Sequence, residues 1–209
     1  AQFDDRKLEL RKPLGISNPK AAFSMPHWPV SRQRIAAWVD SLRQPAARIV
    51  LSPGAGWASK RWPLERFADL ARTIHQQRGV RSLVIWGGAA EEMTAREIVA
   101  AAGDAALLAP ATSLQDLGEL FRMTPLLVSG DTGPLHLAAA VGTRCVGLFG
   151  PVPADRNGPY GRGHVVVEPS ADLRPRWEDR KTDTAAMAGI SVAAVLAAVE
   201  TALSRADAA

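Results

Sequence analysis

Nine consecutive residues, 129–137, combine residue types that can bind an anion. Their sequence, Ser-Gly-Asp-Thr-Gly-Pro-Leu-His-Leu, follows an apolar run at residues 126–128 that is typical of a buried strand. Asp131 or Thr132 can cap a helix that begins here, and Pro134 suits the first turn of such a helix. Free backbone N–H groups and the positive end of the helix dipole attract phosphate. A nucleotide diphosphate is therefore the first candidate ligand.

Three residues of this segment can add to an anion site. Gly133 lets a ligand approach the backbone, because it has no Cβ atom. The Thr132 hydroxyl and His136, one helical turn later on the same side, can supply further donors. The same residues also make an ordinary helix start after an ordinary strand. This segment alone does not distinguish the two interpretations.

Two turns upstream carry similar chemistry. Residues 52–63 bring glycines, a hydroxyl group and Lys60 to a helix start, which suits phosphate binding through backbone donors and a point charge. Residues 86–91 bring Gly87 next to Glu91, whose carboxylate can accept a hydrogen bond from a ribose hydroxyl. Alternatively, the first turn is a flexible surface loop with solvated Lys60 and Arg61. Glu91 would then only make a favourable electrostatic interaction with the positive end of its helix.

Alternating strands and helices are expected to position these turns. Continuous apolar strands that alternate with amphipathic helices predict a doubly wound parallel α/β sheet, in which ligands lie beyond the carboxyl ends of strands. All three turns should therefore open on one edge of the sheet. Apolar runs predict strands at 48–52, 82–86, 106–108, 126–128 and 145–149, with an edge strand at 164–167. Helical periodicity predicts helices at 31–45, 63–74, 90–102, 114–121, 135–141 and 192–203. Ser113 is predicted to cap the helix at 114–121. The last helix can pack on this domain or on a neighbour.

The length of 209 residues allows one substantial core. Residues 1–30 carry four prolines without a sustained period and predict an extended arm or interdomain linker, which leaves 31–209 as one domain. The chain begins with alanine, which favours a trimmed chain or a fragment.

Composition excludes several classes of protein. The net charge of +4 is spread along the chain, which argues against a nucleic-acid surface. No apolar stretch predicts a membrane span, and the N-terminus has no signal-peptide core. The single cysteine, Cys145, lies in an apolar run and is expected to be a buried structural thiol, which weakly favours a reducing cytoplasm.

Two common phosphate-binding motifs do not fit. Gly54 and Gly56 follow the first predicted strand, as in a dinucleotide fold, but Ser59 stands at the third glycine position. No acidic residue closes the next strand, which ends at Trp86. A Walker loop is excluded because the sequence Gly-Lys-Ser/Thr is missing.

Taken together, the motifs resemble glycosyltransferase family 9, the ADP-heptose:lipopolysaccharide heptosyltransferases. The resemblance covers roughly residues 48–165 in order and spacing. It rests on residues 52–55, 60–63, 87–88, 131–140 and 148–151, together with Glu91.

The resemblance implies the C-terminal, donor-binding domain of a GT-B glycosyltransferase. It implies that Asp131, Thr132 and Gly133 hold the diphosphate and that Lys60, the candidate catalytic residue, neutralises the leaving ADP. Glu91 would contact ribose, Thr112 would lie by the adenine, and His136 would support the phosphate turn. The complete implied nucleotide-sugar site is Gly54, Lys60, Gly87, Glu91, Thr112, Asp131, Thr132, Gly133 and His136.

The implied reaction transfers heptose from ADP-heptose to a hydroxyl of the lipopolysaccharide inner core, with inversion. No Asp-x-Asp motif is present, which fits a reaction without metal or other cofactor. The general base and the acceptor site are expected in a separate N-terminal domain. The implied location is cytoplasmic, where the acceptor would bring the protein to the inner membrane as a peripheral partner.

Two departures from the family pattern leave alternatives open. Residues 172–179 stand where many relatives carry cysteines, and Ala55-Gly56 stands where some have paired hydroxyl residues. A non-catalytic module that binds a nucleotide or a nucleotide sugar is the main alternative. A scaffold that binds a partner through its last helix and its tryptophan-containing arm is the other.

Overall fold

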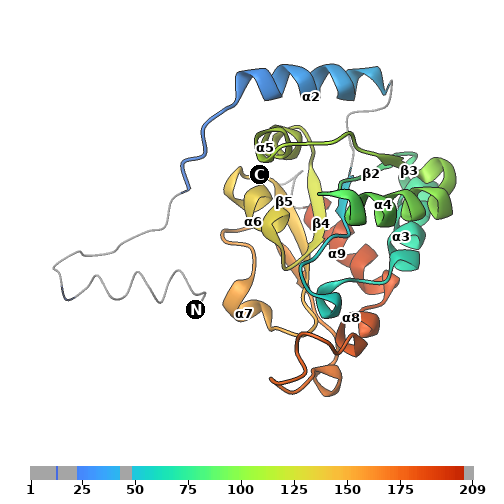
Figure 1. The fold of residues 1–209 in the computed structure, drawn as a ribbon, viewed down its shortest axis with the longest axis vertical. Coiled ribbons are helices and arrows are strands. Elements are labelled where there is room, and N and C mark those ends of the chain that lie inside the picture. Colours follow the sequence, from blue (N-terminus) through green and yellow to red (C-terminus); the bar gives the residue numbers. More distant parts are fainter. Residues whose placement is uncertain (1–12, 14–22, 43–48, 205–209) are drawn as a thin grey trace.

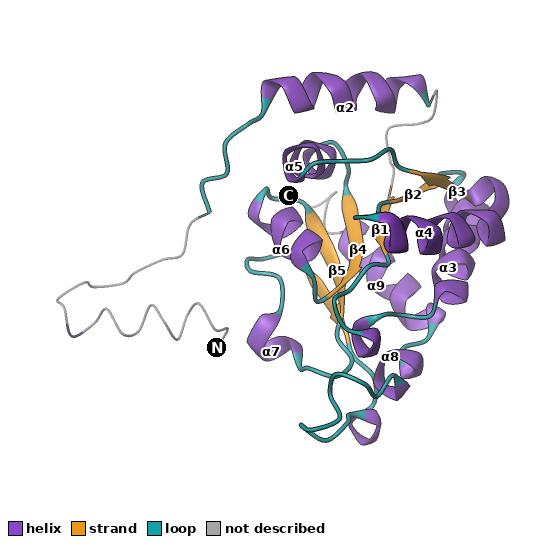
Figure 2. Ribbon diagram, viewed as in Figure 1, coloured by secondary structure: helices purple, strands orange, loops and turns teal. Residues whose placement is uncertain are grey.

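A parallel sheet forms the centre of the protein, as seen in a computed structural model that describes residues 13, 23–42 and 49–204 (Figures 1 and 2). The strand order in this part of the chain is β3-β2-β1-β4-β5-β6, and every neighbouring pair is parallel. The predicted doubly wound α/β sheet, including its edge strand, is therefore confirmed. The strands are β1 (Ile49–Ser52), β2 (Ser82–Val84), β3 (Ala106–Leu108), β4 (Leu126–Gly130), β5 (Arg144–Leu148) and β6 (Val165–Val167).

Helices connect the strands and cover both faces of the sheet. The α-helices are α2 (Pro29–Ser41), α3 (Leu64–Arg78), α4 (Ala89–Ala102), α5 (Leu114–Arg122), α6 (Gly133–Ala140), α7 (Ala154–Asn157), α8 (Ala185–Gly189) and α9 (Val192–Ser204). Short 3-10 turns are η2 (Ala58–Lys60), η3 (Gly103–Ala105) and η4 (Ala171–Leu173).

Some boundaries differ from the predictions. The helix predicted from residue 31 begins at Pro29, because proline is well suited to the first helical position. The helix predicted from residue 135 begins at Gly133, and β2 ends at Val84 rather than at residue 86. Ser113 caps α5 as predicted, in a capping box with Asp116. The predicted end of the first helix near residue 45 lies outside the described residues.

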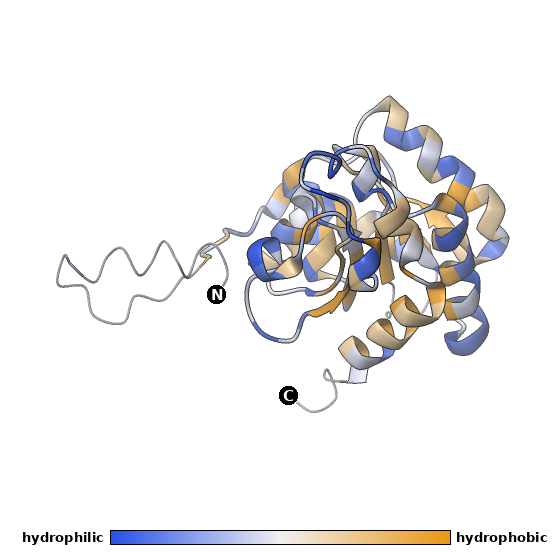
Figure 3. Ribbon diagram, turned by 90° about the horizontal axis from the view of Figure 1, so that it is seen from below, coloured by the Kyte–Doolittle hydropathy of each residue, from blue (hydrophilic) through white to orange (hydrophobic). Residues whose placement is uncertain are grey.

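Successive residues of the central strands point to opposite faces of the sheet, as strand geometry requires. Leu51 and Val128 face a core formed with α3, α4, α8 and α9. Val50 and Leu127 face a second core formed with α2, α5 and α6. Figure 3 shows that hydrophobic residues concentrate on the strands, whereas the surrounding helices also carry hydrophilic residues. Burial on both faces explains the continuous apolar strands in the sequence.

The last helix, α9, packs on this domain, against β5, β6 and α3. This contact resolves the choice between its own domain and a neighbour. Cys145 is fully buried on β5, and burial raises the pKa of its thiol to about 12. The predicted structural thiol is confirmed. In the described residues, no helix combines the length and hydrophobicity needed to cross a membrane.

The end of the predicted arm contacts the domain. Residues 23–28 have no regular secondary structure. The Trp28 backbone N–H donates to Glu119 Oε1 on α5 at 3.0 Å, and a Cβ added at Gly118 would overlap the Trp28 indole. Arg34 of α2 pairs with Asp116 of α5. Helix α2 is thus anchored to α5; the rest of the predicted arm, residues 1–12 and 14–22, lies outside the described residues.

Candidate functional site

A cleft of about 430 Å³ opens at the carboxyl ends of β1 and β4. The strand order changes direction between these two strands, which is where ligands bind in doubly wound sheets. All three predicted turns contribute to the cleft, as expected from the parallel sheet. Its lining includes eight of the nine predicted site residues: Gly54, Lys60, Gly87, Glu91, Thr112, Asp131, Thr132 and Gly133.

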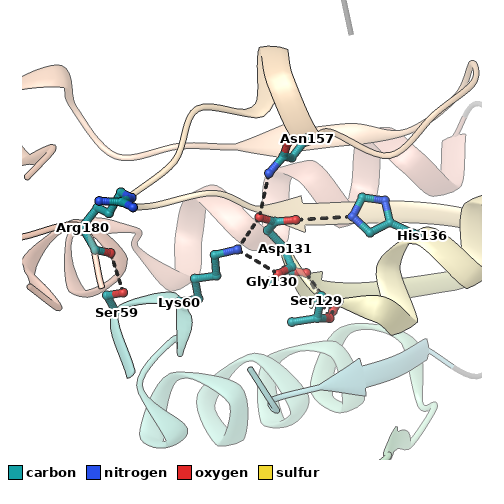
Figure 4. A network of polar contacts seen from close by, with 9 residues as sticks. Ser59, Lys60, Ser129, Gly130, Asp131, His136, Asn157 and Arg180 are labelled. Carbon is teal, nitrogen blue, oxygen red and sulfur yellow. Dashed lines mark hydrogen bonds and ion pairs between the residues drawn. The ribbon is translucent and has the colours of Figure 1, made fainter. Parts of the chain in front are cut away.

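Asp131, directly after β4, is the centre of a polar network (Figure 4). Its Oδ2 accepts hydrogen bonds from Lys60 Nζ at 2.5 Å and from Asn157 Nδ2 at 3.4 Å. Its Oδ1 lies 3.3 Å from His136 Nε2. Burial alone would raise the pKa of Asp131, but the bonds from His136, Lys60 and Asn157 lower it to about 2. The carboxylate is therefore ionised, and an ionised carboxylate cannot donate a hydrogen bond to phosphate.

Helix α6 begins beside this network without a side-chain cap, so the predicted capping by Asp131 or Thr132 is wrong. The Thr132 hydroxyl lies 3.0 Å from Ser129 Oγ and 3.4 Å from the Gly130 carbonyl instead. The first N–H groups of a helix have no acceptor within it. Pro134 has no N–H, and the Leu135 N–H donates to the Thr132 carbonyl at 3.1 Å. Within the described residues, the helix start therefore leaves the N–H groups of Thr132 and Gly133 to an anion in the cleft.

Lys60 ends the η2 turn, and its side chain is only 16% exposed. Besides its bond to the Asp131 carboxylate, Nζ lies 3.5 Å from the Asp131 carbonyl and 4.6 Å from the centroid of the Trp57 ring. A Cβ at Gly130 would lie 3.0 Å from the Lys60 carbonyl, so the η2 turn sits directly against the end of β4. The alternative of a solvated surface lysine is therefore wrong.

Glu91 contacts both the turn at residues 52–63 and the turn at residues 86–91. Its Oε2 accepts a hydrogen bond from the Gly87 N–H at 2.8 Å. A Cβ added at Gly54 would overlap the Glu91 carboxyl group, so this position requires glycine if Glu91 is to stay in place. The carboxylate is therefore fixed at the cleft wall, with acceptor capacity left for a ligand hydroxyl.

The wall near Thr112 is mostly apolar. Thr112 lines the cleft beside Ile85, Trp86 and Leu114. The Trp86 indole is fixed by a hydrogen bond from Nε1 to the Ala109 carbonyl at 2.8 Å. A flat aromatic base fits such a surface better than a phosphate does.

His136 is the predicted site residue that does not line the cleft. Its side chain is 48% exposed and contacts Asp131, so it touches the turn from outside instead of supplying a donor to the cleft.

Asn157 and Trp86 are among the residues of this site that the sequence did not identify. Asn157 lies 26 residues beyond Asp131 on α7, and no local pattern marks it. Trp86 had a signal, since it is an aromatic residue directly before the Gly87 turn. In the described residues, no group of three or more His, Cys, Asp or Glu side chains is arranged to hold a metal ion.

This chain resembles known glycosyltransferases in sequence. A family model for glycosyltransferase family 9 (heptosyltransferase) matches residues 5–185. Lipopolysaccharide heptosyltransferase 1 of Pseudomonas aeruginosa is 32% identical over 146 residues, which are 65% of this chain and 41% of that protein. Lipopolysaccharide heptosyltransferase 3 of Escherichia coli is 27% identical over 149 residues, 70% of this chain and 43% of that protein. The chain thus spans less than half the length of these two curated relatives.

Solved structures share the fold. The glycosyltransferase family 9 protein of Veillonella parvula matches with a TM-score of 0.81 and 22% identity, over 96% of this chain and 60% of that chain. The E. coli ADP-heptose lipopolysaccharide heptosyltransferase II matches with a TM-score of 0.75 and 22% identity, over 92% and 56%. The predicted likeness to a domain of a GT-B glycosyltransferase is confirmed. The extent of the family match shows that this chain belongs to glycosyltransferase family 9.

Proposed function

We propose that this chain binds the nucleotide-sugar donor of a heptosyltransferase, and that the donor is ADP-heptose. The relatives named above are lipopolysaccharide heptosyltransferases, and a solved E. coli neighbour, WaaC, holds ADP. The acceptor is then a hydroxyl of the lipopolysaccharide core, bound by a separate N-terminal domain. Because that acceptor is part of a membrane lipid, the proposed location is the cytoplasmic side of the inner membrane, with peripheral association.

In this proposal each part of the donor occupies its own part of the cleft. The diphosphate would lie between Lys60 Nζ and the N–H groups of Thr132 and Gly133. Ribose would lie near Glu91, and the adenine near Thr112 and Trp86. An ionised Asp131 would hold Lys60 in position and leave phosphate contacts to the backbone.

The proposed reaction is an inverting displacement at the anomeric carbon. An acceptor hydroxyl, deprotonated by a base in the other domain, forms the new bond while the bond to the β-phosphate oxygen breaks. Negative charge then builds on ADP. Lys60 and the positive end of α6 would stabilise that charge without a metal, since both are fixed before the reaction.

One observation carries this proposal: Lys60 Nζ is held inside the cleft by Asp131, at the start of α6. A fixed cation at a helix start is the arrangement that binds a leaving diphosphate.

Calorimetric titration with ADP, GDP and UDP tests it. We expect selective ADP binding, a loss of about 10- to 100-fold in affinity in Lys60→Ala, and a clear loss in Asp131→Ala. Arg96→Ala is the matched control, because it removes an exposed cation paired with Glu92 on α4. Folded wild-type protein that binds no nucleotide, or binds all three equally, would contradict the proposal. Heptose transfer is then assayed with an N-terminal domain added.

A further inference from the structure

Three cationic side chains surround one indole ring at the rim of the cleft. Lys60 Nζ, Lys181 Nζ and Arg180 Cζ lie 4.6, 5.1 and 5.9 Å from the centroid of the Trp57 ring. Trp57 and Lys60 line the cleft, whereas Arg180 and Lys181 do not. The indole therefore lies near one cation that lines the cleft and two cations that do not.

The segment that carries Arg180 is fixed to the turn that carries Lys60. The buried Ser59 hydroxyl donates to the Arg180 carbonyl at 2.7 Å (Figure 4). The Arg180 guanidinium stacks 3.8 Å from the centroid of the Trp177 ring and also donates to the Trp177 carbonyl. A guanidinium that is already oriented loses less conformational entropy when it binds an anion.

The charges of these cations are balanced differently. Lys60 is paired with Asp131. Among the residues that the structure describes, Arg180 and Lys181 form no ion pair with a carboxylate. Contact with an indole face stabilises a cation but does not neutralise its charge. The Arg180 guanidinium and the Lys181 ammonium group therefore keep their charges available to an anion beside Trp57.

The distribution of charge favours a small anionic group over a lipid surface. Residues 172–183 contain four basic and four acidic residues, so the segment is not the polybasic run that binds anionic membranes. Two of its cations, Arg180 and Lys181, instead lie within 5.9 Å of the centroid of the Trp57 ring. Such a pair matches a single phosphate or carboxylate group.

We propose that Arg180 and Lys181 form an anion subsite beside Trp57 that binds a phosphate or carboxylate group of the sugar acceptor. The proposal rests on the proposed function, because the acceptor must reach the anomeric carbon next to the diphosphate at Lys60. The guanidinium and ammonium groups supply charged donors to the anion, and the indole offers an apolar face to the sugar ring. This subsite selects acidic acceptors over neutral ones.

Titration of the ADP-saturated chain with glucose 6-phosphate at low salt tests the subsite, with glucose as the uncharged control. The indole N–H signals of the tryptophans, observed by NMR, report the place of binding. We expect shifts at Trp57 and Trp177 that disappear at high salt. Trp62 is the internal reference, since it is buried and its Nε1 donates to the Ile190 carbonyl.

The double variant Arg180→Gln/Lys181→Gln should weaken this binding about five- to tenfold and leave ADP affinity within about twofold of wild type. Arg176→Gln is the matched control, because it removes a cation from the same segment that is not placed over Trp57. Equal losses in control and double variant would overturn the subsite. Absence of the Trp57 shift, or competition between ADP and the sugar phosphate, would also overturn it. Failure of the chain to bind ADP would instead contradict the proposed function.

Discussion

The turn after β4 and the start of α5 each contain an aspartate that is mostly buried, Asp131 and Asp116. Burial would raise the pKa of both carboxyl groups, but hydrogen bonds lower each to about 2. At Asp116 the donors are Ser113, which belongs to the same helix cap, and Arg34 of α2. At Asp131 a donor is Lys60, which lines the cleft.

A perturbed pKa therefore reveals a well-paired carboxylate and not, by itself, a functional one. Asp116 belongs to the α5 cluster, which we define as Asp116, Glu119, Arg34, Arg122 and Trp28; this cluster fastens α2 and the preceding residues to the domain. Asp131 instead holds a cation toward an open space. The identity and location of the donors distinguish a carboxylate that fastens two elements together from one that holds a lysine at the cleft.

The largest effect is expected from Arg122→Ala in the α5 cluster. The Glu119 side chain is 0% exposed, and Arg122 donates to its Oε1 at 2.9 Å. Removing the guanidinium takes an ion-pair partner and a hydrogen-bond donor from the buried Glu119 carboxylate. The free energy of unfolding, measured by urea titration, should fall by about 3 kcal/mol. ADP affinity should stay within about twofold. A large loss of ADP affinity in the folded variant would contradict the purely structural role of the α5 cluster.

Acid should weaken the polar network around Asp131 over a defined pH range. Because the folded-state pKa of Asp131, about 2, is below its ordinary value of 3.8, the stabilisation it gives is present above pH 3.8 and is lost as pH falls through 2. The shift corresponds to about 2 kcal/mol. Asp131→Asn should therefore show a smaller decrease in unfolding free energy than wild type between pH 4 and 2. Parallel pH curves for the two proteins would contradict the assignment.

Gly54→Ala should weaken ADP binding about five- to tenfold, or about 1 kcal/mol, because the new Cβ displaces the Glu91 carboxyl group. The matched control is Gly56→Ala, since Gly56 also lines the cleft but an added Cβ there meets no atom within 4 Å. In a Glu91→Ala background, Gly54→Ala should cost little more. Additive losses would show that Gly54 acts independently of Glu91.

The smallest effect is expected from Asn157→Ala, which removes a long hydrogen bond of 3.4 Å to Asp131. ADP affinity should fall about twofold, or about 0.5 kcal/mol. Asn157→Asp should weaken binding further, because it places a second negative charge beside Asp131. Asp155→Ala, on the same short helix, is the control. A tenfold loss in Asn157→Ala would indicate that Asn157 contacts the nucleotide directly.

Most of the fold could be predicted because its signals are local. The strand at residues 126–128 and the helix at 90–102 appear close to their predicted limits, since burial on two faces or on one leaves a clear apolar pattern. The cap of α6 was predicted wrongly because Asp131 and Thr132 have good capping chemistry. Their side chains instead bond to Lys60 and Ser129, and tertiary partners outweigh a local preference.

Hydrophobic periodicity and turn chemistry depend on residues close together in the chain, so the sequence predicts the parallel α/β architecture and the three turns that meet at one edge. Four features appear only in the folded structure: the approach of Asn157 and of His136 to Asp131, the place of Trp86 in the cleft, and the contact of Arg180 with Trp57. Contacts such as those of Asn157 and Arg180 join segments far apart in sequence. They depend on how helices and loops pack over the sheet, which no local pattern encodes.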